Sequence, residues 1–112
     1  MAVYNQVYGN QTFGTGNWLG DELFKESLIE PYSEHVIDSY VTQISVDLER
    51  IGIFGAISEF NVLDVGSGRQ ALAFNKLGAK SVNHRDISEE NVRRLKKHVE
   101  KNSINLATKQ ID

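Results

Sequence analysis

The sequence predicts an α/β fold with a parallel sheet. Three segments of strand length lie in its second half, at residues 61–65, 80–86 and 106–111. Segments with apolar residues at helical spacing separate them. Strands that alternate with helices pair in parallel and pack against those helices. We therefore expect the order helix, strand, helix, strand, helix, strand from residue 33 onward.

The first of these strands and the turn after it organise the chain. Val62, Leu63 and Val65 give the apolar, β-branched run of a buried strand. Gly66 and Gly68 allow a sharp turn and a close approach of a ligand to the backbone. Where a helix begins after such a turn, free backbone N–H groups and the positive end of the helix dipole point to one place. This arrangement suits an anion or a polar small molecule, and it predicts binding of a nucleotide-like cofactor.

Helices are predicted on both sides of this turn. After it, apolar residues at helical spacing continue to Gly78, which is typical of the residue just past a helix end. Before it, Asp21 can cap a short helix, and Ser33 can cap a longer one that should continue to about Gly52. Ser88 is the expected cap of the last helix, whose inward residues are Val92, Leu95 and Val99.

The composition indicates one globular domain and excludes several kinds of site. The chain has 112 residues, is 40% hydrophobic and contains a single proline. It has no cysteine, so it offers no disulfide, thiol nucleophile or cysteine-based metal site. The histidine, aspartate and glutamate residues form no set with metal-ligand spacing, so no metal is expected. The first residues do not resemble a signal peptide, and no apolar run approaches the roughly 20 residues that span a bilayer. We expect a cytoplasmic protein without a membrane partner.

The net charge of -3 conceals an asymmetry between the two parts of the chain. Up to Val65, acidic residues far outnumber the basic Lys25 and Arg50, whereas basic residues prevail after Gly66. This second part would suit an anionic substrate such as nucleic acid. A solvated helix face is the commoner origin of such a pattern.

Two short motifs carry a resemblance to a known family. Leu-Asp-Val-Gly-Ser-Gly occupies residues 63–68, and Asp86-Ile87-Ser88 follows the second predicted strand. Together with Gly78-Ala79-Lys80 between them, they closely resemble the class I S-adenosylmethionine-dependent methyltransferases. That family has an acidic residue two places before a G-x-G turn and another at the end of the second strand. The resemblance covers about residues 60–112.

The resemblance implies a Rossmann-like three-layer sandwich with a parallel sheet. This chain would supply the first three strands and the N-terminal helices, so the sandwich would be incomplete. Residues 31–112 would be the N-terminal half of an S-adenosylmethionine-binding domain, and residues 1–30 an N-terminal arm or lid with a short helix. In the family the first strand is central, whereas here it would be an exposed edge. The remainder of a longer chain, or a second copy in a homo-oligomer, would then cover it.

The resemblance also assigns roles in holding S-adenosyl-L-methionine around the first turn. Gly66 and Gly68, with Ser67 between them, would let the methionine part of the cofactor lie against the backbone. Asp64 would lie beneath the turn and help to fix the amino-acid end. The alternatives from the residues alone are that Asp64 is a strand-end carboxylate bonded by neighbouring N–H groups and that the glycines form only a tight turn.

Further roles fall after the second and third strands. Asp86 would accept hydrogen bonds from both ribose hydroxyls, since a carboxylate has two oxygens. Ile87 would pack on the adenine face, and Asp112 falls where the family often places an acidic residue near the adenine amino group. Alternatively, Asp86 only forms a turn before a capped helix. His84 and Arg85 replace the small and apolar residues usual in the family at these positions, and we expect them to face solvent. The alternatives are that both face a partner or that Arg85 contacts a substrate phosphate.

A glycine-rich stretch near the start is the second notable motif. Residues 12–18 read Thr-Phe-Gly-Thr-Gly-Asn-Trp and partly resemble a Phe-Gly-Thr-Gly loop of methyltransferases that modify ribosomal proteins. Phe13, Gly14, Gly16 and Trp18 would form a lid over cofactor or substrate. Alternatively, Phe13 and Trp18 anchor the loop in the core.

The sequence thus predicts a methyltransferase whose acceptor is not identified: nucleic acid, protein and small molecules all remain open. It assigns no catalytic residue, because positioning dominates methyl transfer. One alternative is an NAD-type Rossmann protein, since residues 66–71 satisfy G-x-G-x-x-A. Asp64 speaks against it, because its carboxylate would repel a pyrophosphate. Another alternative is a non-catalytic, methyltransferase-like binding module.

Overall fold

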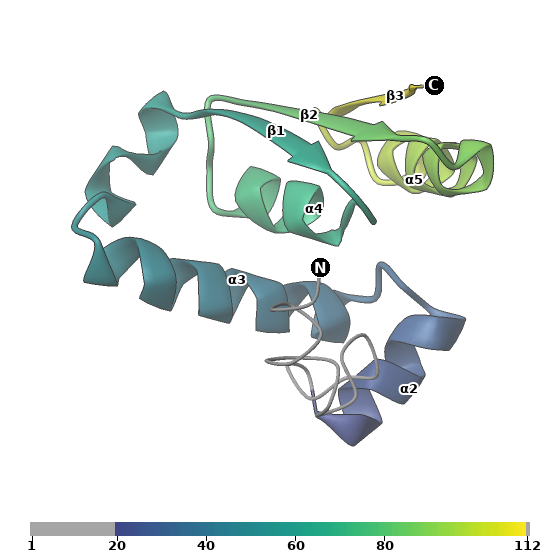
Figure 1. Ribbon diagram of the computed structural model, residues 1–112, viewed down its shortest axis with the longest axis horizontal. Helices are drawn as coiled ribbons and strands as arrows, with labels where there is room; N and C mark the ends of the chain where they lie inside the picture. The colour runs from purple at the N-terminus through teal and green to yellow at the C-terminus, as the bar shows by residue number, and fades with distance from the viewer. Residues whose placement is uncertain (1–19, 112) are drawn as a thin grey trace, which may run out of the picture. The chain divides into compact units, whose positions relative to one another are not determined.

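The computed structural model describes residues 20–111 and shows the expected α/β order. Its elements are α2 (Asp21–Ile29), α3 (Glu34–Arg50), the 3-10 helix η2 (Phe54–Glu59), β1 (Asn61–Val65), α4 (Arg69–Lys76), β2 (Ser81–Asp86), α5 (Glu89–Lys101) and β3 (Ala107–Gln110) (Figure 1). Two compact units divide within α3, between Ser39 and Tyr40, and the whole sheet belongs to the second unit. No helix within residues 20–111 combines the length and apolar character needed to cross a membrane.

The second unit is built on a three-stranded parallel sheet. Its strand order is β1-β2-β3, which confirms that β1 lies at an edge of the sheet formed by the described residues. The register pairs Asp64 with His84 and His84 with Thr108, so these residues form one row across the sheet. Helices α4 and α5 lie on the same face of the sheet (Figure 1). Both crossovers step in the same direction, and right-handed connections then place both helices on one side.

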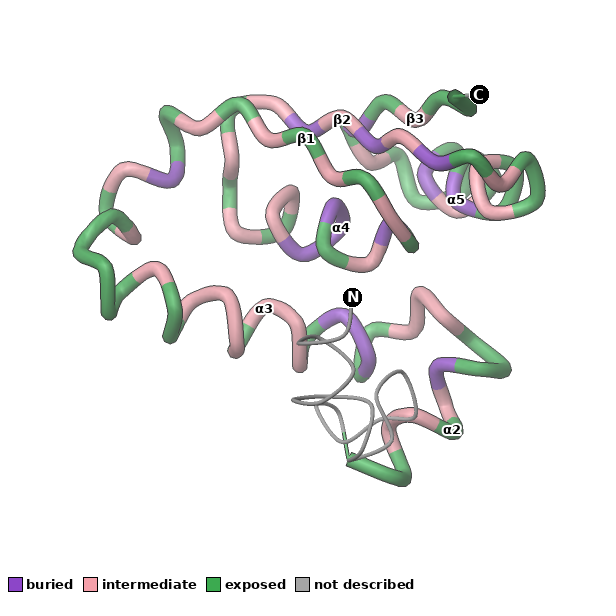
Figure 2. The backbone as a smooth tube through the Cα atoms, viewed as in Figure 1, coloured by how far each residue is buried: buried purple, intermediate pink, exposed green. Residues whose placement is uncertain are grey.

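The core of this unit fills the space between the sheet and the two helices. Buried residues gather on α4, β2 and α5 where these elements face one another (Figure 2). They include Leu72, Val82, Leu95 and Val99. Each large apolar side chain buried in this way contributes about 1.5–3 kcal/mol to the free energy of unfolding. This layer fixes the positions of the strand ends that carry the candidate site.

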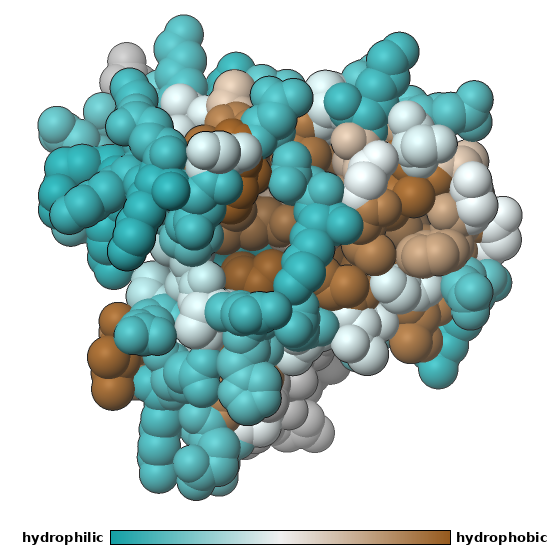
Figure 3. Space-filling model, turned by 180° about the vertical axis from the view of Figure 1, so that it is seen from behind, coloured by the Kyte–Doolittle hydropathy of each residue, from teal (hydrophilic) through white to brown (hydrophobic). Residues whose placement is uncertain are grey.

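Strand β1 is less buried than predicted. Leu63 and Val65 keep 63% and 66% of their surface exposed, whereas Val62, which precedes them, is half-buried. The helices cover one face of the sheet, so the alternate residues of β1 on the other face stay at the surface. Apolar side chains accordingly reach the surface of the molecule among polar ones, as Figure 3 shows for one view.

The first unit contains α2 and the beginning of α3. The Ser33 hydroxyl oxygen accepts a hydrogen bond from the backbone N–H of Val36 at 3.2 Å, which confirms Ser33 as the cap of α3. The same hydroxyl donates to the Glu26 carboxylate of α2. Asp21 is not a cap, contrary to the prediction: it is the first residue of α2, and Gly20 precedes it without a side-chain capping bond.

Element boundaries differ from the predictions by a few residues. Helix α3 ends at Arg50 rather than near Gly52, and the segment before β1 forms the short helix η2. Strand β3 is shorter than the predicted 106–111. Ser88 caps α5 as predicted, because its hydroxyl oxygen accepts the backbone N–H of Asn91 at 3.2 Å.

Candidate functional site

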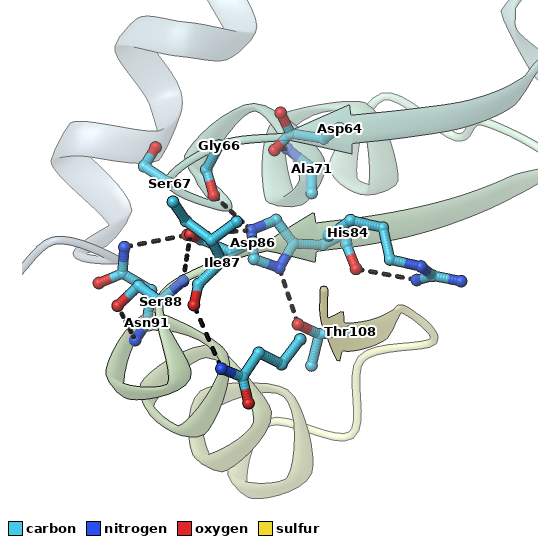
Figure 4. A network of polar contacts seen from close by, with 12 residues as sticks. Asp64, Gly66, Ser67, Ala71, His84, Asp86, Ile87, Ser88, Asn91 and Thr108 are labelled. Carbon is cyan, nitrogen blue, oxygen red and sulfur yellow. Dashed lines mark hydrogen bonds and ion pairs between the residues drawn. The ribbon is translucent and has the colours of Figure 1, made fainter. Parts of the chain in front are cut away.

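The two predicted carboxylates lie at the same end of neighbouring strands. Asp64 is the fourth residue of β1, and Asp86 is the last residue of β2. Asp64 pairs with His84, and Asp86 follows His84 by two residues, so all three side chains belong to the same face of the sheet. Figure 4 shows them beside the turn at Gly66 and the start of α5. The structure therefore brings the predicted site residues of both strands together.

Asp64 closes the turn between β1 and α4. Its Oδ2 accepts the backbone N–H of Ala71 in the first turn of α4 at 3.0 Å. The N-cap residue Gly68 has no side chain to bond the helix, so the Asp64 carboxylate, four residues earlier in the chain, takes that role. The Ala71 N–H at this helix start is thus already bonded within the chain, as the alternative interpretation of Asp64 expected.

Burial sets the protonation behaviour of Asp64. It raises the pKa of this carboxyl above the ordinary value of 3.8, and the negative charge of Asp86 adds to the rise. Hydrogen bonds from the N–H groups of Ala71 and Gly68, together with His84, act in the opposite direction but do not cancel it. Asp64 is therefore an acid whose charge is only partly compensated by its surroundings.

The two glycines of the turn have different roles. Gly68 has φ of +92°, and a Cβ there would lie 2.8 Å from Leu95 Cδ2, so the residue lets α5 pack closely against the turn. Gly66 lies outside the left-handed region, and a Cβ there would meet nothing nearer than Asp64 Oδ1 at 3.8 Å. The absence of a side chain at Gly68 therefore serves packing against a core leucine. Gly66 keeps one open side.

Ser67 lies between the glycines and is exposed. Its hydroxyl oxygen accepts from the backbone N–H of Arg69 at 3.4 Å and from the Arg69 Nε–H at 3.3 Å. These long contacts hold the Arg69 side chain next to the turn.

Asp86 is buried and bonded on both carboxylate oxygens. Its Oδ1 accepts the Ser88 N–H at 2.8 Å, and its Oδ2 accepts the Asn91 side-chain amide at 3.0 Å. Burial by itself would raise the pKa of Asp86, but these hydrogen bonds and His84 outweigh it and lower the pKa. Each carboxylate oxygen has two lone pairs, so each can still accept another donor.

Ile87 follows Asp86 and is 70% exposed. Its carbonyl oxygen accepts the Gln110 side-chain amide at 3.2 Å, which ties this short segment to the end of β3. The exposed Ile87 side chain is therefore an apolar surface directly beside the Asp86 carboxylate, and the flat face of a ring could pack against it.

His84 is fully buried, contrary to the expectation that it faces solvent. It shares its side of β2 with the buried Val82 and Asp86, as alternation along a strand requires. Its ring contacts Thr108 Oγ1 through Nδ1 at 2.7 Å and the Gly66 carbonyl oxygen through Nε2 at 2.5 Å. Arg85 belongs to the opposite face, is half-buried, and donates from Nη1 to the backbone carbonyl of His84 at 2.9 Å.

Four polar residues complete the site without having been predicted as part of it: His84, Asn91, Thr108 and Gln110. Strand alternation from Val82 was a sufficient signal for His84. Asn91 lies three residues after the cap Ser88, and a polar side chain at this position of a helix can bond back to the residues before the helix. Thr108 and Gln110 required the register of β3, which no local pattern supplies.

Some predicted site residues lie outside the described part of the chain. These are Asp112 and the lid residues Phe13, Gly14, Gly16 and Trp18. Within residues 20–111, no cluster of three or more histidine and carboxylate side chains could hold a metal ion. Comparison with protein-family models, with curated protein sequences and with solved structures found no match. Function is therefore inferred from the residues of this chain alone.

Proposed function

We propose that this chain binds S-adenosyl-L-methionine at the ends of β1 and β2 and forms the cofactor-binding part of a methyltransferase. One observation carries the proposal: two carboxylates end adjacent parallel strands on the same face, next to a glycine turn with an open side. Ligands of open parallel sheets bind outside the carboxyl ends of the strands. When bound, the cofactor supplies the electrophilic methyl group.

The residues of the second strand end suit a nucleoside. Asp86 is ionised at neutral pH because its pKa is lowered, and a carboxylate can accept hydrogen bonds from two neighbouring hydroxyls. Ile87 would cover one face of the base and would bury apolar surface that is now 70% exposed. Such burial is favourable in proportion to the area removed from water.

The first strand end suits a cationic group better than a phosphate. Asp64 already bonds the Ala71 N–H, one of the groups that would otherwise cradle a pyrophosphate at the start of α4. Asp64 and Asp86 also give this end of the sheet a negative character, which repels a dinucleotide and attracts a sulfonium or ammonium group. We therefore prefer S-adenosyl-L-methionine to an NAD-type cofactor.

A glycine-to-alanine pair tests the proposal with a matched control. Gly66→Ala places a methyl group on the open side of the turn without straining the chain, and Gly55→Ala does the same in η2, where a Cβ meets nothing within 4 Å. Both variants should unfold at nearly the wild-type temperature. Only Gly66→Ala should weaken binding of S-adenosylhomocysteine, by about tenfold or more, equivalent to 1.4 kcal/mol.

Calorimetric titration with S-adenosylhomocysteine and, separately, with NAD gives the readout. Binding of NAD alone would replace the proposal with the dinucleotide alternative. Binding of neither ligand would favour a non-catalytic module. Equal affinity of the Gly66 and Gly55 variants for S-adenosylhomocysteine would place the ligand away from this turn. The methyl acceptor, whether nucleic acid, protein or small molecule, stays open in all of these outcomes.

A further inference from the structure

His84 is a fully buried polar side chain at the centre of the site, and the proposed binding roles do not use it. It stands on the middle strand and contacts both neighbours: Thr108 of β3 and the carbonyl oxygen of Gly66 after β1. Its Nε2 also lies 3.9 Å from Asp86 Oδ2. One ring therefore connects β2 with β3 and with the turn after β1 (Figure 4).

The partners of the ring determine which nitrogen carries hydrogen. A backbone carbonyl oxygen can only accept, so Nε2 must donate to Gly66. In the neutral ring Nδ1 then accepts, and the Thr108 hydroxyl is the group that donates to it. The Gly66 carbonyl thus fixes the tautomer, and the threonine hydroxyl, which can donate or accept, satisfies the other ring nitrogen.

Both polar backbone groups of Gly66 are held by β2. Its carbonyl oxygen accepts from His84 Nε2, and its N–H donates to the Arg85 carbonyl at 3.2 Å. Gly66 has no side chain, so packing cannot orient its peptide groups, and these two bonds must do so. A small or apolar residue at position 84 would leave the carbonyl of the half-buried Gly66 without this donor, so one of the two bonds that orient the peptide would be lost.

We propose that His84 is a positioning residue that holds the Gly66 peptide in the orientation from which the turn receives its ligand. This inference rests on the proposed function for the identity of that ligand. The bond from Nε2 is the essential element. Thr108 satisfies the other ring nitrogen, Nδ1, from β3.

Two nearly isosteric variants separate this role from simple packing. His84→Gln keeps an N–H donor at about the distance of Nε2, whereas His84→Met fills a similar volume with no donor. Thr108→Val is the control, because it removes the support of Nδ1 but leaves the Nε2 bond. All three variants should lose some thermal stability, so melting temperature alone does not decide.

The deciding measurements are hydrogen exchange at the Gly66 amide, relative to the buried Ala73 of α4, and affinity for S-adenosylhomocysteine. In His84→Met we expect relative exchange at Gly66 to be about tenfold faster and binding about tenfold weaker, the factor equivalent to 1.4 kcal/mol. His84→Gln should stay within about threefold of wild type in both, and Thr108→Val should leave relative exchange at Gly66 unchanged.

Three results would overturn the inference. One is wild-type exchange at Gly66 in His84→Met, and another is a glutamine variant that behaves like the methionine variant. The third is a Thr108→Val variant that loosens Gly66 as much as His84→Met, because the sheet rather than the Nε2 bond would then hold the turn. If wild-type protein does not bind S-adenosylhomocysteine, the proposed function fails, and the exchange data still decide whether His84 positions the turn.

Discussion

The two strand-to-helix turns of this sheet begin alike and are stabilised differently. Each follows a strand that carries an aspartate on the helix-covered face, at Asp64 and at Asp86. After β1, the aspartate itself bonds into the helix, because the N-cap is Gly68 and has no side chain to offer. After β2, Ser88 caps the helix, and Asp86 bonds the turn and the Asn91 side chain instead.

This difference explains why the same residue type has opposite pKa shifts at two neighbouring positions. Burial raises the pKa of Asp64, since the groups that compensate its charge are insufficient. Asp86 is also buried, but the Ser88 N–H, the Asn91 amide and His84 stabilise its charge enough to lower the pKa. The supply of hydrogen-bond donors, rather than burial alone, decides the direction. In the first turn, Asp64 stabilises the start of the helix. In the second turn, Ser88 and Asn91 stabilise the charge of Asp86.

The largest effect is expected from Gly68→Ala, a substitution in the first turn. Alanine at φ of +92° is strained, and its Cβ would press on Leu95 at 2.8 Å. We expect a loss of about 2 kcal/mol or more in the free energy of unfolding. Urea denaturation measures it, and Gly66→Ala is the control that should change stability little. A Gly68→Ala protein as stable as wild type would show that α5 does not need this close approach.

Asp64→Ala should have the next largest effect, because it removes the partner of the Ala71 N–H at the start of α4. The expected loss is about 1–2 kcal/mol, as for other helix caps. Asp64→Asn retains an acceptor oxygen and should recover most of that stability in the same urea assay. Ser88→Ala is the counterpart in the second turn, and its loss should be about 1 kcal/mol. An Asp64→Ala protein that loses less stability than Ser88→Ala would contradict the contrast between the turns.

The smallest effect is a pH dependence of opposite sign for the two carboxylates. Asp86 has a lowered pKa, so its contribution to stability is present above the ordinary value of 3.8 and is lost as pH falls through its folded pKa. Asp64 has a raised pKa, so its contribution is present below 3.8 and is lost as pH rises through its folded pKa. Denaturation from pH 3 to 7 checks both signs by comparing wild type with Asp64→Asn and Asp86→Asn.

Relative to wild type, Asp86→Asn should lose less stability on acidification below pH 3.8. Asp64→Asn should lose less stability as pH rises above that value. Other carboxylates titrate in the same range, so the differences between proteins are informative and the absolute slopes are not. Parallel slopes for the two variants would refute the opposite pKa shifts.

The sequence predicted the elements well where a local pattern and a local cap agree. Ser33 and Ser88 precede helical apolar patterns and do cap α3 and α5. Asp21 had the right residue type, yet it is already the first residue of the helix, and the cap position falls on Gly20, which makes no side-chain capping bond. Propensity at a helix start does not say which residue adopts the non-helical backbone of the cap.

The predictions were weaker where the answer depends on which face of the sheet is covered. Leu63 and Val65 were expected to be buried and His84 exposed, and the reverse holds. Hydropathy predicts burial from the residue type, whereas in a strand covered on one face the burial of a residue depends on the face to which its side chain points. Polar His84 is accepted in the core because Gly66 and Thr108 satisfy both of its ring nitrogens.

The sequence by itself determined the order of helices and strands, the parallel sheet and the placing of an aspartate near the end of two successive strands, because these follow from local periodicity and short-range chemistry. Only the tertiary structure decided that Gly68 serves packing against Leu95, that Gly66 retains an open side, and that His84 connects β2 with β3 and with the turn after β1. These depend on contacts between residues far apart in the chain, which arise when α5 and β3 pack into place.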